Sequence, residues 1–343
     1  MSITTPKSLE NFYFHNVGAF EDTLGVGENS LVRVPKSICD TLEGNARFGA
    51  LDSVGVEIRF VTESKNINIY ISCQKPKFAE MGNIQIYKGE FFIGAFTLRP
   101  GVKEIIRIPL LEDFAHSNEK LFNTKGFHSN VWRILCSNTT TVLHGVETYG
   151  VPIRKPYDYE MPSKKWLAYG SSITHSQQNG YPYITAKRLG LDMQNLGMSG
   201  GCLIEKELVD YIFNNREFDY ITCELGINMR GYITPDEFER RSRYLLDKIV
   251  EKGCKAVIIS VFPNGLSKEY AKNPDNIQTY NESMYNEILP RLVREYNDEK
   301  IRFVSGSEIF DEIGALRWDL LHPTEYGHAI MAFNLIPILE EFF

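Results

Sequence analysis

Trp166-Leu-Ala-Tyr-Gly-Ser-Ser-Ile-Thr174 is the stretch that decides how the second half of this chain folds. Its first four residues are mostly apolar and predict a short buried strand. Gly170 ends that strand, and the hydroxyls of Ser171, Ser172 and Thr174 follow it. Because ligands bind at the carboxyl ends of strands in a parallel sheet, we expect these hydroxyls to face reactants. Taken alone, a serine here fits a helix cap as well as a nucleophile.

Outward from this stretch, residues 166–343 alternate between apolar strands and helices. Strands are expected at Trp166–Tyr169, Asp192–Leu196, Tyr220–Leu225, Ala256–Phe262 and Arg302–Ser305. Helices are expected at Tyr181–Leu189, Ile204–Phe213, Pro235–Glu251, Ile277–Tyr296 and Pro323–Phe342. Continuous apolar strands joined by helices predict a parallel sheet that is covered on both faces.

Residues 1–150 have a different pattern. Apolar residues alternate with polar ones in short segments, at residues 54–61, 66–72, 83–87, 90–96, 104–109, 131–135 and 141–146. Such alternation at short, regular spacing is typical of a sandwich or jelly roll. Residues 151–165 contain three prolines and predict a linker. The expected order is an all-β sandwich or jelly-roll accessory domain (1–150), a linker (151–165) and an α/β domain (166–343).

The composition is that of an ordinary globular protein, with 43% hydrophobic and 24% charged residues, and 343 residues fit two domains. The net charge of −7 offers no basic face, so no nucleic-acid partner is expected. The first residues lack a signal-peptide pattern, and no apolar run reaches about 20 residues, so no membrane association is expected. The six cysteines are scattered without a Cys-x-x-Cys pair, which favours buried free thiols in a cytoplasmic protein.

Two glycine-containing loops follow predicted strands. Asn195-Leu-Gly-Met-Ser-Gly-Gly201 has three glycines that let the backbone approach a ligand, although a tight turn explains them as well. Glu224-Leu-Gly-Ile-Asn-Met229 places Asn228 after a buried strand. The Asn228 amide there can donate to an oxyanion or simply form a turn.

A third loop, Asp319-Leu-Leu-His-Pro-Thr-Glu-Tyr-Gly-His328, contains an acid three residues before a histidine. In a turn, Asp319 can accept from one ring nitrogen of His322 while the other nitrogen faces a serine. A lone Asp-x-x-His pair is a weak signal, because structural pairs of this kind are more common. We expect His328 to be structural, and His175 to contact substrate rather than act as the base.

Together these stretches resemble the SGNH (GDSL-like) hydrolases. Gly170-Ser-Ser-Ile-Thr174, the Gly200 loop, Gly226-Ile-Asn228 and Asp319-Leu-Leu-His-Pro323 occur in that family's order and spacing, over about residues 164–343. The resemblance implies the SGNH hydrolase fold, with a parallel five-stranded flavodoxin-like sheet and flanking helices, for a catalytic domain at 166–343. It also implies that Ser172 is the nucleophile and His322 the base, oriented by Asp319. The oxyanion would be held by the N–H groups of Ser172 and Gly200 and by the Asn228 amide. A β-rich first half resembles family members with an N-terminal jelly roll, including some carbohydrate esterases and one acyltransferase type.

Two positions depart from the family pattern. Ser171 replaces its common Asp, and Met229 replaces the acid that often follows the Asn; Met229 and His175 are taken as substrate contacts. The expected activity is that of a serine esterase or acyl hydrolase for small acyl esters such as acetyl, with acylated sugars as candidate substrates. The alternatives are an acyltransferase that uses the same acyl-enzyme, and a carbohydrate-binding protein with an inactive hydrolase domain. No cofactor and no metal are expected.

Overall fold

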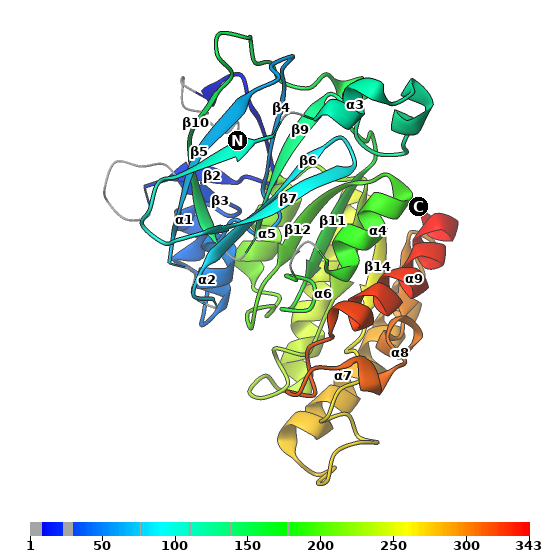
Figure 1. Ribbon diagram of the computed structural model, residues 1–343. Helices are drawn as coiled ribbons and strands as arrows, with labels where there is room; N and C mark the ends of the chain where they lie inside the picture. The colour runs from blue at the N-terminus through cyan, green and yellow to red at the C-terminus, as the bar shows by residue number, and fades with distance from the viewer. Residues whose placement is uncertain are drawn as a thin grey trace. The chain divides into compact units, whose positions relative to one another are not determined.

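The computed structural model describes residues 9–343 except 23–29, 76, 78, 110, 138, 177 and 178. The chain divides into two compact units, whose elements are labelled in Figure 1. Unit 1 comprises Met1–Cys39, Ala50–Ser163 and Gly190–Gln194, and unit 2 comprises Asp40–Gly49, Lys164–Leu189 and Asn195–Phe343.

Unit 1 is a sandwich of two antiparallel sheets. The first has the strand order β1 (Tyr13–His15), β4 (Glu57–Val61), β9 (Val131–Ser137), β6 (Gly82–Lys88) and β7 (Phe91–Leu98). The second has the order β2 (Ala19–Glu21), β3 (Ser30–Val32), β10 (Thr140–Glu147), β5 (Ile67–Gln74) and β8 (Glu104–Ile108). One apolar core joins them, with Ile58 and Ile84 from the first sheet and Ile69 and Ile71 from the second fully buried. The predicted β-sandwich is therefore confirmed, because the alternating segments became strands β4 to β10.

Short elements in the first half of the chain escaped the sequence analysis. They are strands β1 to β3, helices α1 (Lys36–Cys39), α2 (Ala46–Leu51) and α3 (Glu112–His116), and the 3₁₀ turns η2 (Glu119–Phe122) and η3 (Asp158–Glu160). The three helices have four to six residues. One helical turn is too short to display a periodicity of 3.6 residues, so these helices leave no pattern in the sequence.

The third sheet is parallel. Its strand order is β12 (Asp192–Gly197), β11 (Lys165–Gly170), β13 (Tyr220–Glu224), β14 (Lys255–Ile259) and β15 (Ile301–Val304). Numbered along the chain this order is 2-1-3-4-5, that of flavodoxin-like sheets. The predicted parallel five-stranded sheet is confirmed. Loops at the carboxyl ends of these strands carry the candidate site.

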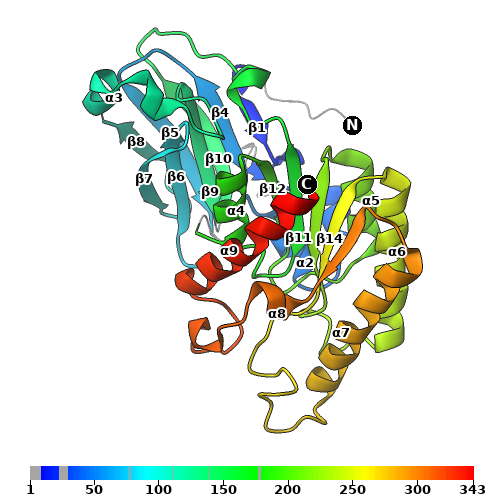
Figure 2. The same ribbon diagram turned by 90° about the vertical axis from the view of Figure 1, so that its right-hand side faces the viewer.

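Helices cover both faces of this sheet. Helices α4 (Tyr181–Leu189) and α9 (Glu325–Phe342) pack against each other, and Figure 2 shows α5 (Lys206–Asn215), α6 (Pro235–Lys252) and α7 (Ile277–Tyr296) on the opposite face. The predicted start of α6 is confirmed, since Thr234 accepts the Glu237 N–H at 3.3 Å and Pro235 opens the helix. Helix α8 (Gly306–Ile309) and the turn η4 (Ile313–Ala315) are short additions.

All six cysteines are free and buried. Burial raises the pKa of the Cys254 thiol to about 11, so this side chain stays protonated and packs as a small apolar group. Within the part of the chain that the structure describes, no helix combines the length and the apolar character that a bilayer span requires.

Candidate active site

Ser172 lies in the turn that directly follows β11, at the carboxyl end of the strand. Its neighbours Ser171 and Thr174 are fully buried, whereas Ser172 is partly exposed. The His175 N–H donates to the Ser171 carbonyl at 2.9 Å, which closes a single turn, and α4 begins only at Tyr181. The Ser172 side chain is therefore presented by a short rigid turn rather than by the first turn of a long helix.

His322 and Asp319 form a hydrogen-bonded series with Ser172. The Ser172 Oγ lies 2.8 Å from His322 Nε2, and His322 Nδ1 lies 2.8 Å from Asp319 Oδ2. One ring nitrogen thus faces the hydroxyl while the other donates to the carboxylate, an arrangement that selects one tautomer. Ser172 and His322 are 150 residues apart in the chain, so only the fold brings them together. This is the relation of nucleophile, base and orienting acid that acyl transfer uses.

Hydrogen bonds within its own loop hold Asp319 in place. Its Oδ1 accepts the backbone N–H groups of Leu321 at 3.0 Å and His322 at 2.9 Å. Leu320 has φ +56°, a left-handed conformation that a leucine rarely adopts, and its carbonyl accepts the Gly265 N–H at 2.7 Å. Burial raises the pKa of Asp319, but the hydrogen bonds from His322 and Leu321 outweigh it and bring the pKa below its usual value. Asp319 is therefore ionised beside the imidazole at neutral pH.

Gly200 and Asn228 lie in loops that hydrogen bonds tie to the same region. The Met198 N–H donates to the Gly170 carbonyl at 2.7 Å, which places the 198–201 loop beside the end of β11. Gly200 has φ +63°, a conformation that favours glycine. The Asn228 Oδ1 accepts the Cys202 N–H at 3.1 Å, so the NH₂ end of that amide is the end left to donate to a ligand.

The other predicted contacts are buried. Met229 is fully buried and His175 is 6% exposed. Their role as substrate contacts stays a prediction. His328 receives the Tyr181 N–H on Nδ1 at 3.4 Å. Burial first, and then Arg317 and His322, lower the pKa of His328 to about 4, which leaves it neutral.

Glu224 is a buried acid that contacts the turn of residues 171–174, and the sequence analysis did not single it out. Its Oε2 accepts the Ser171 N–H at 2.6 Å and the Thr174 hydroxyl at 3.2 Å, while its Oε1 has no hydrogen-bond partner. Burial raises the pKa of Glu224 to about 7 against the hydrogen bonds from these two residues. Where Ser171 replaces the family's Asp, Glu224 brings a carboxyl group to the same turn from β13. The sequence shows an acid at the end of a mostly apolar strand, but not which residues that acid contacts.

Residues 40–49 also belong to unit 2 and pack against the Gly200 loop. A Cβ atom on Gly200 would lie 2.7 Å from Asn45 Nδ2, and one on Gly201 would lie 2.3 Å from the Ala46 nitrogen. The Glu43 N–H donates to Glu205 Oε1 at 2.6 Å, across 162 positions of sequence. No local pattern could reveal a contact over that separation.

The chain resembles known proteins in sequence family and in fold. Residues 168–330 match the model of the GDSL-like lipase/acylhydrolase family. No curated protein matches the chain. Among solved structures, the chain resembles the salicylyl-acyltransferase SsfX3 from a tetracycline biosynthetic pathway, with a TM-score of 0.78 and 15% identity over 96% of this chain and 94% of that one.

Two further structures extend the likeness. A candidate GDSL-like lipase from Bacteroides ovatus ATCC 8483 has a TM-score of 0.72 and 16% identity, over 97% of this chain and 96% of that one. A family two carbohydrate esterase from Clostridium thermocellum, in complex with cellohexaose, has a TM-score of 0.61 and 12% identity, over 84% and 93% of the chains. At these identities the three structures share the fold of this chain.

Proposed function

We propose that this chain, whose residues 168–330 match the GDSL-like lipase/acylhydrolase family, is a serine acyl hydrolase that cleaves small acyl esters of carbohydrates. The observation that carries the proposal is the series from Ser172 Oγ to His322 Nε2 and from His322 Nδ1 to Asp319 Oδ2, with 2.8 Å at each step. A hydroxyl held this way can lose its proton as it attacks a carbonyl.

The reaction follows from that series. Ser172 Oγ forms a bond to the ester carbonyl carbon while His322 Nε2 takes its proton. The N–H groups of Ser172 and Gly200 and the Asn228 NH₂ hold the oxyanion of the tetrahedral intermediate. His322 then gives the proton to the leaving alcohol as its C–O bond breaks. Water repeats the cycle on the acyl-enzyme, releasing the acid and restoring the Ser172 hydroxyl.

The exposed indole of Trp318 supports a carbohydrate as the alcohol component of the ester substrate. Trp318 directly precedes Asp319 in the chain and is 92% exposed, so its flat apolar face is open to solvent. The carbohydrate esterase from Clostridium thermocellum shares the fold, which agrees with this class of substrate. We expect Trp318→Ala to raise KM for acetylated sugars while kcat and stability hold, because an exposed side chain contributes little to the core. Unchanged KM values would argue against a sugar stacked on Trp318.

The test of the proposal is covalent labelling. Wild-type protein treated with a fluorophosphonate should gain one adduct on Ser172, located by peptide mass spectrometry, and Ser172→Ala should gain none. Ser172→Ala should also lower kcat for p-nitrophenyl acetate by several orders of magnitude. Ser176→Ala, four residues along the chain, is the matched control and should keep full activity. A label on Ser171 or Ser176 would contradict the assignment of the nucleophile.

An acyltransferase is the second candidate, favoured by the fold shared with the salicylyl-acyltransferase. The same acyl-enzyme would then pass its acyl group to an alcohol instead of water. Product analysis in the presence of an acceptor sugar separates the two, since a transferase makes more acylated acceptor than free acid. A wild-type protein that binds acetylated sugars but hydrolyses no ester would instead be an inactive, carbohydrate-binding member of the family.

A further inference from the structure

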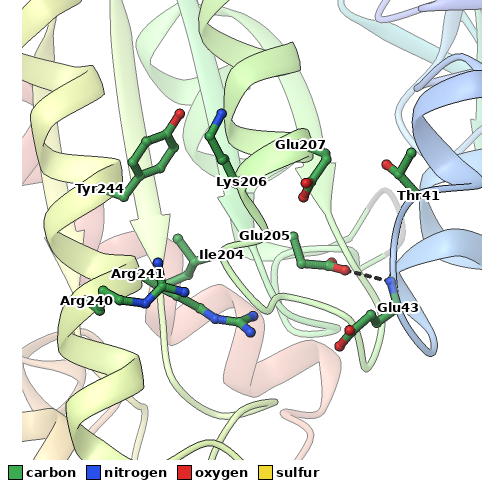
Figure 3. Close-up of a pocket in the computed structure, with 9 residues that line it drawn as sticks. All are labelled: Thr41, Glu43, Ile204, Glu205, Lys206, Glu207, Arg240, Arg241 and Tyr244. Atoms are coloured by element: carbon green, nitrogen blue, oxygen red, sulfur yellow. Dashed lines mark hydrogen bonds between the residues drawn. The ribbon is translucent and has the colours of Figure 1, made fainter.

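A cavity of about 320 Å³ lies within unit 2, between the 40–49 segment, the start of α5 and one turn of α6 (Figure 3). Of the described residues that line it, none belongs to the series of Ser172, His322 and Asp319. Its volume is at the lower end of the range for small-molecule sites, so an occupant would be small.

Glu205 is the lining residue that needs an explanation. It is only 7% exposed and stands at the N-cap of α5, yet its side chain makes no capping hydrogen bond. Its Oε1 accepts the Glu43 N–H at 2.6 Å, whereas its Oε2 is buried without a hydrogen-bond partner. An unpaired buried carboxyl oxygen is costly, and proteins rarely retain one without a role.

The charges around the cavity are unevenly compensated. Lys206 pairs with Asp210, and Arg240 and Arg241 share Glu237, so the three cations of the lining are paired with two acids outside it and one positive charge is left over. Glu43, Glu205 and Glu207 have no ion-pair partner among the described residues. Figure 3 shows these three glutamates on one side of the cavity and the arginines and Tyr244 on the other. The glutamate side therefore carries an unbalanced negative charge.

We propose that this cavity binds a small organic amine, whose ammonium group donates to Glu205 Oε2. An ammonium offers three donors and the missing positive charge in one compact group. The site goes beyond the proposed esterase activity, because it needs no part of the Ser172 series. An occupant would also contact residues of the 40–49 segment, which packs against the loop that carries Gly200.

The ionisation of Glu205 gives the binding a defined pH dependence. Burial raises the pKa of Glu205 to about 7; the Glu43 N–H and Arg241 oppose the rise, while the charges of Glu43 and Glu207 add to it. The other titratable groups that interact with Glu205 are Tyr169, Cys202 and Tyr232. An ammonium binds the ionised carboxylate, so the apparent affinity should follow the ionised fraction of Glu205. With a pKa of about 7, Kd should be roughly tenfold higher at pH 6 than at pH 8.

Isothermal titration calorimetry on the full chain tests this with matched pairs of probes. The amines are ethanolamine, putrescine and N-methylglucamine, and their neutral counterparts are ethylene glycol, 1,4-butanediol and sorbitol. We expect at least one amine to bind better than its counterpart, with the tenfold pH effect. If no amine exceeds its counterpart, or if sorbitol binds as well as N-methylglucamine does, the proposal is overturned.

Three variants locate the binding. Glu205→Gln keeps an acceptor for the Glu43 N–H and removes the charge, so its Tm should be no lower than that of wild type and amine binding should weaken by roughly tenfold or more. Glu251→Gln makes the same charge change at an exposed position of α6 and should bind as wild type does. Ser172→Ala should also bind as wild type, which separates this site from the proposed active site. Wild-type affinity in Glu205→Gln would overturn the assignment.

Discussion

Replacing Glu224 by Gln should make the stability of unit 2 less sensitive to pH between 5 and 8. Glu224 is 1% exposed, and burial raises its pKa from 4.5 to about 7. An acid with a higher pKa in the folded chain holds its proton more tightly there than in the unfolded chain. Raising the pH from about 4.5 to about 7 therefore lowers the free energy of unfolding. Gln keeps the size and the acceptor but has no proton to lose.

The magnitude follows from the two pKa values. They differ by about 2.5, which at 1.36 kcal/mol for each pH unit corresponds to about 3.4 kcal/mol in total. About 2.5 kcal/mol of this falls between pH 5 and pH 8. Wild type should lose that amount relative to Glu224→Gln over the interval, because the contributions of other groups, Glu205 included, are common to both proteins and cancel.

Urea titrations at pH 5, 6, 7 and 8, followed by tryptophan emission, measure the difference. A Trp132→Phe background leaves Trp166, which is fully buried in β11, as the main reporter, since Trp318 is already 92% exposed. Glu251→Gln serves as the control for a change of one charge at the surface. A difference in unfolding free energy between wild type and Glu224→Gln that stays constant from pH 5 to pH 8 would refute the reasoning.

Three further outcomes are expected. Asn228→Ala should lower kcat for p-nitrophenyl acetate by about 10²- to 10³-fold with KM little changed, and a loss in KM alone would make Asn228 a ground-state contact. Asp319→Asn should lower kcat by about 10⁴-fold, and adding it to His322→Ala should cost little more; fully additive losses would mean that the two residues act independently. Gly201→Ala places a Cβ 2.3 Å from the Ala46 nitrogen, so thermal unfolding should show a loss of about 1–3 kcal/mol, whereas an unchanged Tm would contradict the packing of the 40–49 segment.

Much of the fold follows from local pattern. The alternation in segments such as residues 66–72 predicted strand β5, and the helix expected at Pro235–Glu251 begins at Pro235 as α6. The order of the parallel strands came from the family resemblance carried by four short motifs. Short elements such as β2 and α1 were missed because a few residues are not enough to show a period.

For the candidate site, the sequence identified the residues but not all of their contacts. The sequence motifs pointed to Ser172, His322 and Asp319. The structure brings these three residues within hydrogen-bonding distance of one another in series. Their catalytic roles, like those of Gly200 and Asn228, remain proposals. The contacts of Glu224 with the turn of residues 171–174 and of Glu205 with the 40–49 segment could not be predicted.

The physical reason for this difference is the sequence distance between the residues that determine each feature. Whether a segment becomes a strand or a helix depends on neighbours two to four positions away, which the sequence displays directly. Whether Glu224 loses its solvent, or whether Glu43 reaches Glu205 across 162 positions, depends on how the whole chain closes around them. Burial sets the pKa of Glu224 and leaves one oxygen of Glu205 without a partner, and burial exists only in the tertiary structure.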